Sequence, residues 1–218
     1  MKKLLVVLSL LIMFLAPTIA LAATLYIEED YQRDGMGTYI NGIGWAGVLN
    51  SQMEGNPIPN GIVCLDVKGI AYKDWSTSGN VYALTAANVT HFRFFNGDVN
   101  STLYNYHKAA WLLGQMYNHK SETAGIQFAI WEIFRPTDFN IYGYGTDLGN
   151  LAQKWLNNVN GLTDLNSYDF SSVRIFTPTD TRVQEFMHVH APIPPTLYLL
   201  GAGLAGLVGL RKWFLRKH

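Results

Sequence analysis

Apolar residues at helical spacing predict three helices in the second half of the chain. In 102–117, TLYNYHKAAWLLGQMY, apolar side chains recur every three or four residues, as on one face of a helix. The segment 146–162 has the same amphipathic pattern. The segment 124–134, AGIQFAIWEIF, is apolar nearly all round, so we expect a helix buried on every side. Ser121 or Thr123 is placed to cap the start of that helix.

Alternating apolar and polar residues on both sides of these helices predict β-strands. The segment 24–59 alternates in this way and contains many Gly and Asn residues. A strand is also expected in 60–72, NGIVCLDVKGIAY, which opens with a turn-forming Asn-Gly pair. Two closing strands are expected in 172–178 and 182–191. The order of strands, helices and strands predicts an α+β fold, with a β-sandwich or barrel framework and a small helical insert.

The first 22 residues have the pattern of a secretory signal peptide. Lys2 and Lys3 form a basic start, residues 4–15 are an apolar stretch, and residues 20–22, Ala-Leu-Ala, make a small-residue cleavage site. An uncleaved membrane anchor is the alternative, but the apolar stretch is short. We therefore expect an exported protein whose mature chain begins near Ala23.

The segment 191–218 combines a proline motif, an apolar stretch and a basic end. As a helix, the apolar residues 196–210 would be about 22 Å long, less than the roughly 30 Å core of a bilayer. The basic end should stay in the cytoplasm, which leaves the body of the protein outside. The residues that define the segment are Pro192, Pro194 and Pro195 in the motif and Arg211 and Lys212 at the basic end.

This arrangement resembles the PEP-CTERM sorting signal, and a plain short membrane anchor is the alternative. The resemblance implies an exosortase-like processing enzyme as a partner and a transient anchor in the inner membrane. The final location would be the cell surface or an extracellular matrix. Ile193 stands where that family has Glu, so the motif is closer to the related Pro-x-Pro variants.

The remaining body, 23–190, is long enough for one domain with a substantial core. The full chain has 16 basic and 16 acidic residues, and two of the basic residues lie in the signal peptide and four in the tail. The body therefore keeps ten basic and sixteen acidic residues, a formal charge of −6. This charge argues against nucleic acid as a partner, since nucleic-acid binding needs a basic face.

Two lone residues, Cys64 and Gln127, carry the candidate chemistry. Cys64 is the only cysteine of the chain, so it cannot form an internal disulfide, and a free thiol outside the cell is liable to oxidation. Gln127 lies on the apolar helix, where a buried amide needs hydrogen-bond partners. A cysteine thiolate can attack a glutamine amide, expel ammonia and leave an internal thioester. Such a cross-link would close a loop of about 60 residues, worth roughly 4 kcal/mol if the disulfide entropy relation applies.

The sequence VCLD, followed about 60 residues later by Gln-x-Ala-Ile-Trp, resembles the bacterial thioester domain of surface adhesins, the TQxA domain. The segments 108–117 and 183–189 add to this resemblance. It implies a thioester between Cys64 and Gln127 that captures a nucleophile on a surface protein or polysaccharide. Such a protein binds covalently once and is not an enzyme, and no cofactor is implied. Ile126 stands where the family has Thr. The packing residues of the motif would be Ala129, Ile130 and Trp131.

Other interpretations of these residues remain open. Gln127 could be a satisfied polar residue in the core and Cys64 an inert core residue, in a non-covalent matrix or carbohydrate-binding module of the same fold. A cysteine hydrolase would pair Cys64 with His107 or His119, but no nucleophile signature surrounds the cysteine. His188 and His190 have the spacing of a zinc-binding pair on a strand, although a solvated strand face is favoured, with no metal.

A polar loop before the first predicted helix has some of the spacing of a calcium loop. Asn96, Asp98 and Asn100 alternate as calcium ligands do, but His107 stands where the acidic residue of position twelve is required. A polar turn is therefore favoured over a calcium site.

Overall fold

The computed structural model describes residues 21–28, 36–41, 43–69, 74–137 and 139–190. Both predicted targeting segments fall almost wholly outside these ranges, namely the signal peptide 1–22 and the sorting signal 191–218. The described residues include no helix that is both long enough and apolar enough to span a bilayer. The predicted cleavage point lies within the first strand, after two exposed residues and before its first buried one, Ala23.

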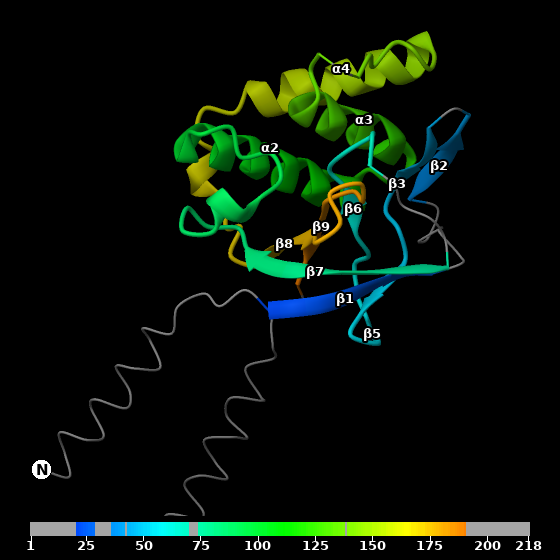
Figure 1. Cartoon of the computed structure of the whole chain (residues 1–218). Coiled ribbons are helices and arrows are strands. Elements are labelled where there is room, and N and C mark those ends of the chain that lie inside the picture. Colours follow the sequence, from blue (N-terminus) through cyan, green and yellow to red (C-terminus); the bar gives the residue numbers. More distant parts are fainter. Residues whose placement is uncertain (1–20, 29–35, 42, 70–73, 138, 191–218) are drawn as a thin grey trace, which may run out of the picture.

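A seven-stranded antiparallel sheet forms the framework, in the order β5-β4-β1-β7-β8-β9-β6 (Figure 1). A separate hairpin lies beside it. The sheet contains β1 (Leu21–Ile27), β4 (Ser51–Met53), β5 (Asn56–Pro57), β6 (Val63–Cys64), β7 (Trp75–Ala83), β8 (Val173–Pro178) and β9 (Phe186–Val189). The hairpin contains β2 (Gly37–Ile40) and β3 (Gly44–Gly47).

Three α-helices form a layer on one side of this sheet (Figure 1). They are α2 (Val99–Asn118), α3 (Thr123–Phe134) and α4 (Thr146–Asn160), accompanied by short 3-10 turns at Val89–His91, Lys120–Glu122 and Leu165–Ser167. All three helices lie between β7 and β8 in the chain, so the predicted α+β class and the helical insert are confirmed. The β framework is a curled half-barrel with the small hairpin beside it, so it is nearer to the predicted barrel than to the predicted sandwich. The sandwich alternative is wrong, because helices cover the face that a second large sheet would occupy.

The boundaries of several elements differ from those expected. The predicted strand 60–72 is reduced to two residues, because the chain turns at Asp66, whose carboxylate accepts a hydrogen bond from the Lys68 backbone N–H at 2.9 Å. Helix α3 has no side-chain cap. Thr123 is its first helical residue instead, and its hydroxyl donates to the carbonyl of Lys120 at 2.6 Å.

Helix α3 is buried on nearly every side, as its composition predicts. Nine of its twelve residues are buried, so it needs neighbours all round. It contacts α2, α4 and the β2–β3 hairpin. At Gly125 the approach of α4 is so close that a Cβ atom would lie 2.5 Å from the Cγ of Leu151. This glycine therefore sets the distance between α3 and α4.

We predict that Gly125→Ala destabilises the protein by about 1–3 kcal/mol, although alanine favours helices, because the added methyl group overpacks the contact with Leu151. Gly114 on α2 is a matched control, since nothing lies within 4 Å of the Cβ that an alanine would add there. Gly114→Ala should stabilise by up to about 1 kcal/mol through helix propensity. Urea unfolding midpoints measure both. Equal shifts in the same direction would show that the α3–α4 contact does not depend on a glycine.

Candidate functional site

Cys64 and Gln127 meet in the core, although 63 positions separate them in the sequence. The amide Nε2 of Gln127 donates a hydrogen bond to the backbone carbonyl of Cys64 at 2.7 Å. Gln127 is 0% exposed and Cys64 is 4% exposed. The reverse amide orientation would set two carbonyl oxygens against each other, so this contact fixes the nitrogen on the side of the cysteine. The pair suggested by the sequence is therefore assembled by the fold.

Cys64 is held at the edge of the sheet by a short ladder. It is the last residue of β6 and lies opposite Phe186 of β9, while Val63 lies opposite Met187. Directly after it, the N–H of Leu65 donates to the carbonyl of Glu185 at 2.8 Å. Gln127 is the fifth residue of α3, so the free N–H groups at the helix start belong to the residues before it.

A half-buried ion pair holds the segment after Cys64 to the far end of α3. Arg135, directly after the helix, donates through Nη2 to Oδ2 of Asp66 at 3.0 Å and through Nε to Oδ1 at 3.3 Å. Asp66 is 3% exposed, and the fork geometry is the strong form of a carboxylate–guanidinium pair. The Cys64–Asp66 segment is therefore fixed to α3 at two points, through Gln127 and through Arg135.

The thiol of Cys64 is in an environment that favours its protonated form. Burial raises the pKa of Cys64 far above its usual range, and the nearby negative charge of Asp66 raises it further. A neutral thiol is a weak nucleophile but carries a proton that a departing amine can take. This environment therefore suits an inert thiol. It also suits a reaction in which the thiol loses its proton at the same time as the sulfur forms a bond to an acyl carbon.

Two polar atoms beside this contact have no hydrogen-bond partner among the described residues. They are Oε1 of Gln127 and Nε1 of Trp131, one helical turn further along α3. Ala129 and Ile130 are 0% exposed and Trp131 is 1% exposed, so all three motif residues lie in the core. Ile126 is also 0% exposed, and it gives this end of the site an apolar wall.

A buried carboxylate that the sequence did not reveal, Glu185, supports the strand next to Cys64. Its Oε1 accepts from the N–H of Arg93 at 2.9 Å and the hydroxyl of Thr177 at 2.7 Å, and its Oε2 accepts from the hydroxyl of Tyr106. Burial raises the pKa of Glu185, while these donors lower it. An acidic residue on a predicted strand, directly before the apolar pair Phe186-Met187, was the only signal that could have identified it.

The two possible metal sites considered from the sequence are the histidine pair and the loop with calcium-like spacing. The expectation of a solvated face for the histidine pair is wrong for His188, which is 3% exposed, because it faces a pocket that residues of the β4–β5 region also line. The loop with calcium-like spacing is a polar turn, since Asp98 accepts from the N–H of Ser101 at 2.6 Å and so caps α2. Within the described ranges, no three or more His, Cys, Asp or Glu side chains are grouped to hold a metal.

The two histidines considered as partners of Cys64 in a hydrolase contact other residues. The ring of His107 stacks on Phe170, with 4.6 Å between the ring centres, and the ring of His119 packs against Trp155 at 5.0 Å. The group whose charge acts on the thiol is Asp66.

The sequence matches no protein family model and no curated protein. The fold is similar to that of the N-terminal domain of the Streptococcus pyogenes pilus tip adhesin Cpa, with a TM-score of 0.50 and 11% sequence identity. The similarity covers 77% of this chain and 92% of the adhesin domain. At this identity the comparison establishes a shared fold.

We predict opposite changes in thiol pKa when the two charges beside Cys64 are removed separately. The measurement uses a Gln127→Met background, which leaves the thiol free and the core filled. Asp66→Asn should lower the thiol pKa, because it removes a negative charge that disfavours the thiolate. Arg135→Leu should raise it, because the carboxylate loses its counter-charge.

The rate of alkylation by iodoacetamide at one fixed pH, followed by intact mass, reports both changes, because the rate below the pKa follows the thiolate fraction. Asp66→Asn should speed alkylation and Arg135→Leu should slow it. Both substitutions also loosen the same loop, which alone would speed alkylation in each variant. Faster alkylation in both variants would therefore show that loop opening, and not charge, controls the thiol.

Proposed function

We propose that this chain is an exported surface or matrix protein in which Cys64 and Gln127 form an internal thioester for covalent attachment. The observation that carries the proposal is the 2.7 Å contact between the Gln127 amide nitrogen and the Cys64 backbone inside the core. The adhesin fold of the similar structure supports a surface location. The resemblance of the VCLD and Gln-x-Ala-Ile-Trp segments to the thioester domain supports the chemistry.

The reaction balances without a cofactor. The sulfur of Cys64 bonds to the side-chain carbonyl carbon of Gln127, and the bond from that carbon to Nε2 breaks. The thiol proton goes to the departing nitrogen, which leaves as ammonia. Because the site is dry, water reaches the product slowly, and an incoming amine or hydroxyl can later take the acyl group and return the thiol.

A second buried glutamine shows why the hydrogen bond alone does not define the site. Gln184 is 8% exposed, donates through Nε2 to the carbonyl of Gly69 at 2.9 Å, and has an unpartnered Oε1 within the described ranges. Its polar surroundings resemble those of Gln127, but the backbone carbonyl that it contacts belongs to a glycine. The presence of a neighbouring sulfur atom therefore distinguishes Gln127, the proposed reactive glutamine, from Gln184, a structural one.

The proposed attachment also needs delivery to the surface. The sorting signal at 191–218 would supply it through an exosortase-like enzyme and a transient membrane stage, as its resemblance to PEP-CTERM signals implies. The target would be a nucleophile on a surface protein or a polysaccharide.

A non-covalent carbohydrate-binding module is a second candidate, favoured by a pocket of about 460 Å³ at the start of α2. Its lining combines an aromatic face with amide and hydroxyl groups, the combination that sugars bind. The aromatic side chains are Tyr104, which is 43% exposed, and His107. The acidic body favours a neutral polysaccharide. The lining residues are Asn100, Ser101, Leu103, Tyr104, His107 and Asn166.

We predict that the protein weighs one ammonia less than its sequence requires and that methylamine adds to it at Gln127. Cys64→Ala and Gln127→Ala should each abolish both effects, whereas Gln184→Met should preserve them. Intact mass and peptide mapping provide the measurement. A full sequence mass in fresh protein, together with a thiol that titrates on unfolding, would exclude the thioester.

We predict for the second candidate that Tyr104→Ala weakens binding to a neutral polysaccharide by roughly tenfold, since an aromatic contact in a binding site is worth about 1 kcal/mol or more. Tyr39→Ala is the control, because Tyr39 is 70% exposed on β2. Sedimentation of the Cys64→Ala protein with the polysaccharide isolates the non-covalent component. Equal binding by the two tyrosine variants would rule out this pocket.

A further inference from the structure

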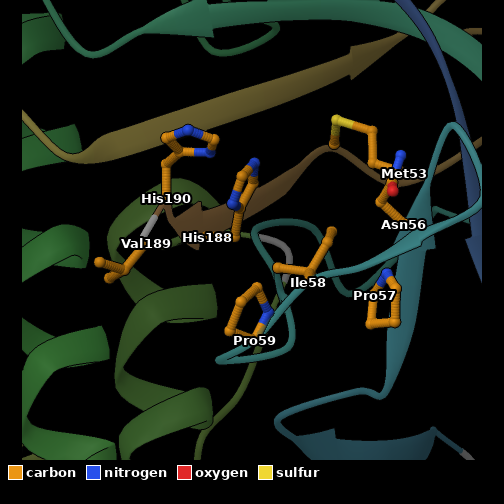
Figure 2. A pocket seen from close by; sticks show the side chains of 8 residues that line it. All are labelled: Met53, Asn56, Pro57, Ile58, Pro59, His188, Val189 and His190. Atoms are coloured by element: carbon orange, nitrogen blue, oxygen red, sulfur yellow. The ribbon is translucent and has the colours of Figure 1, made fainter. Parts of the chain in front are cut away.

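A pocket of about 430 Å³ lies where the two edges of the curled sheet approach each other. One wall comes from the β4–β5 turn and the residues after it, and the other from the end of β9, although β5 and β9 are far apart in the strand order (Figure 2). The lining includes Met53, Pro57, Ile58, Pro59, His188 and His190 and contains no carboxylate. Neither the proposed thioester nor the aromatic pocket uses these residues.

His188 is the unusual group of this pocket, because its imidazole is buried and neither ring nitrogen has a hydrogen-bond partner among the described residues. The residue is 3% exposed. Buried polar side chains nearly always have such partners. A neutral imidazole has one ring nitrogen with a free lone pair, which can bind a metal ion.

His190 and Met53 provide two further donors around the same space. The ring centres of His188 and His190 are 6.4 Å apart. With metal–nitrogen bonds of about 2 Å, two imidazoles on opposite sides of one ion have centres about 6.5 Å apart at most, so small side-chain rotations bring both rings onto one ion. Figure 2 shows Met53 across the pocket from the two rings, beside Asn56, with its thioether sulfur directed toward the side where the rings lie.

The donor set and its surroundings select the kind of ion. A thioether with two imidazoles suits a soft metal, whereas calcium and magnesium require oxygen ligands. Arg174 lies opposite His188 in the β8–β9 register, and its positive charge disfavours a divalent cation more than a monovalent one. We propose that this pocket binds one Cu(I) ion through His188, His190 and Met53.

The test uses the full chain in detergent, with Cys64→Ala as the background so that the thiol does not compete for copper. Cu(I) is supplied under reducing conditions and its affinity is measured by competition with a chromogenic chelator. One ion should bind per chain. His190→Ala and Met53→Leu should each weaken binding by more than roughly tenfold, since even residues that only orient metal ligands are worth about 10–100-fold.

Two features of the design keep the result interpretable. His190 is exposed and Met53→Leu conserves volume, so both variants should fold, and His91→Ala replaces an exposed histidine outside the pocket as the control. Absence of one-to-one binding, or equal affinity in all three variants, would overturn the proposal. Tighter binding of Zn(II) than of Cu(I) would overturn the choice of ion. None of these results depends on thioester formation, because the background variant cannot form it.

Discussion

Complete burial of α3 is the constraint on which the rest of the structure depends. A helix with nine buried residues among twelve needs neighbours on nearly every side, and two other helices, a hairpin and the segment that carries Cys64 supply them. A glutamine in such a helix can find partners only in the elements that cover it. Here the partner is the backbone of Cys64. Because other elements must pack against α3 to bury it, the amide of Gln127 and the only cysteine of the chain come into contact.

The sequence was sufficient for the parts of the fold that depend on local pattern. The periodicity of 102–117 and 146–162 and the apolar character of 124–134 predicted α2, α4 and α3, and the order of elements predicted the helical insert. The predicted sandwich was wrong because apolar alternation shows that a strand has a buried face but not what covers it. The length of β6 was missed because the turn after Cys64 depends on Asp66. Its carboxylate accepts from the Lys68 backbone and is held by Arg135, which lies 69 positions further along the chain.

The candidate site was predictable in its two principal residues but not in its electrostatics. Cys64 and Gln127 stood out because each was a lone residue of its type in an apolar element. The two buried carboxylates, Asp66 and Glu185, gave no comparable signal, because their roles depend on partners at positions 135, 93, 106 and 177. These carboxylates have different effects. Asp66 adds to the effect of burial in raising the pKa of the Cys64 thiol, while Glu185 secures the strand against which Cys64 is paired.

The place of Gln127 in the order of elements also has a mechanical meaning. If the protein were held to a target through the acyl group of Gln127 and to the cell through the chain beyond His190, the covalent path between these points would run from α3 through α4 and β8 to the end of β9. The elements before Gln127, which include β1, β7 and α2, would lie outside this path. Tension would therefore load α4 and the β8–β9 pairs first, while unfolding of the first half of the domain would not lengthen the tether.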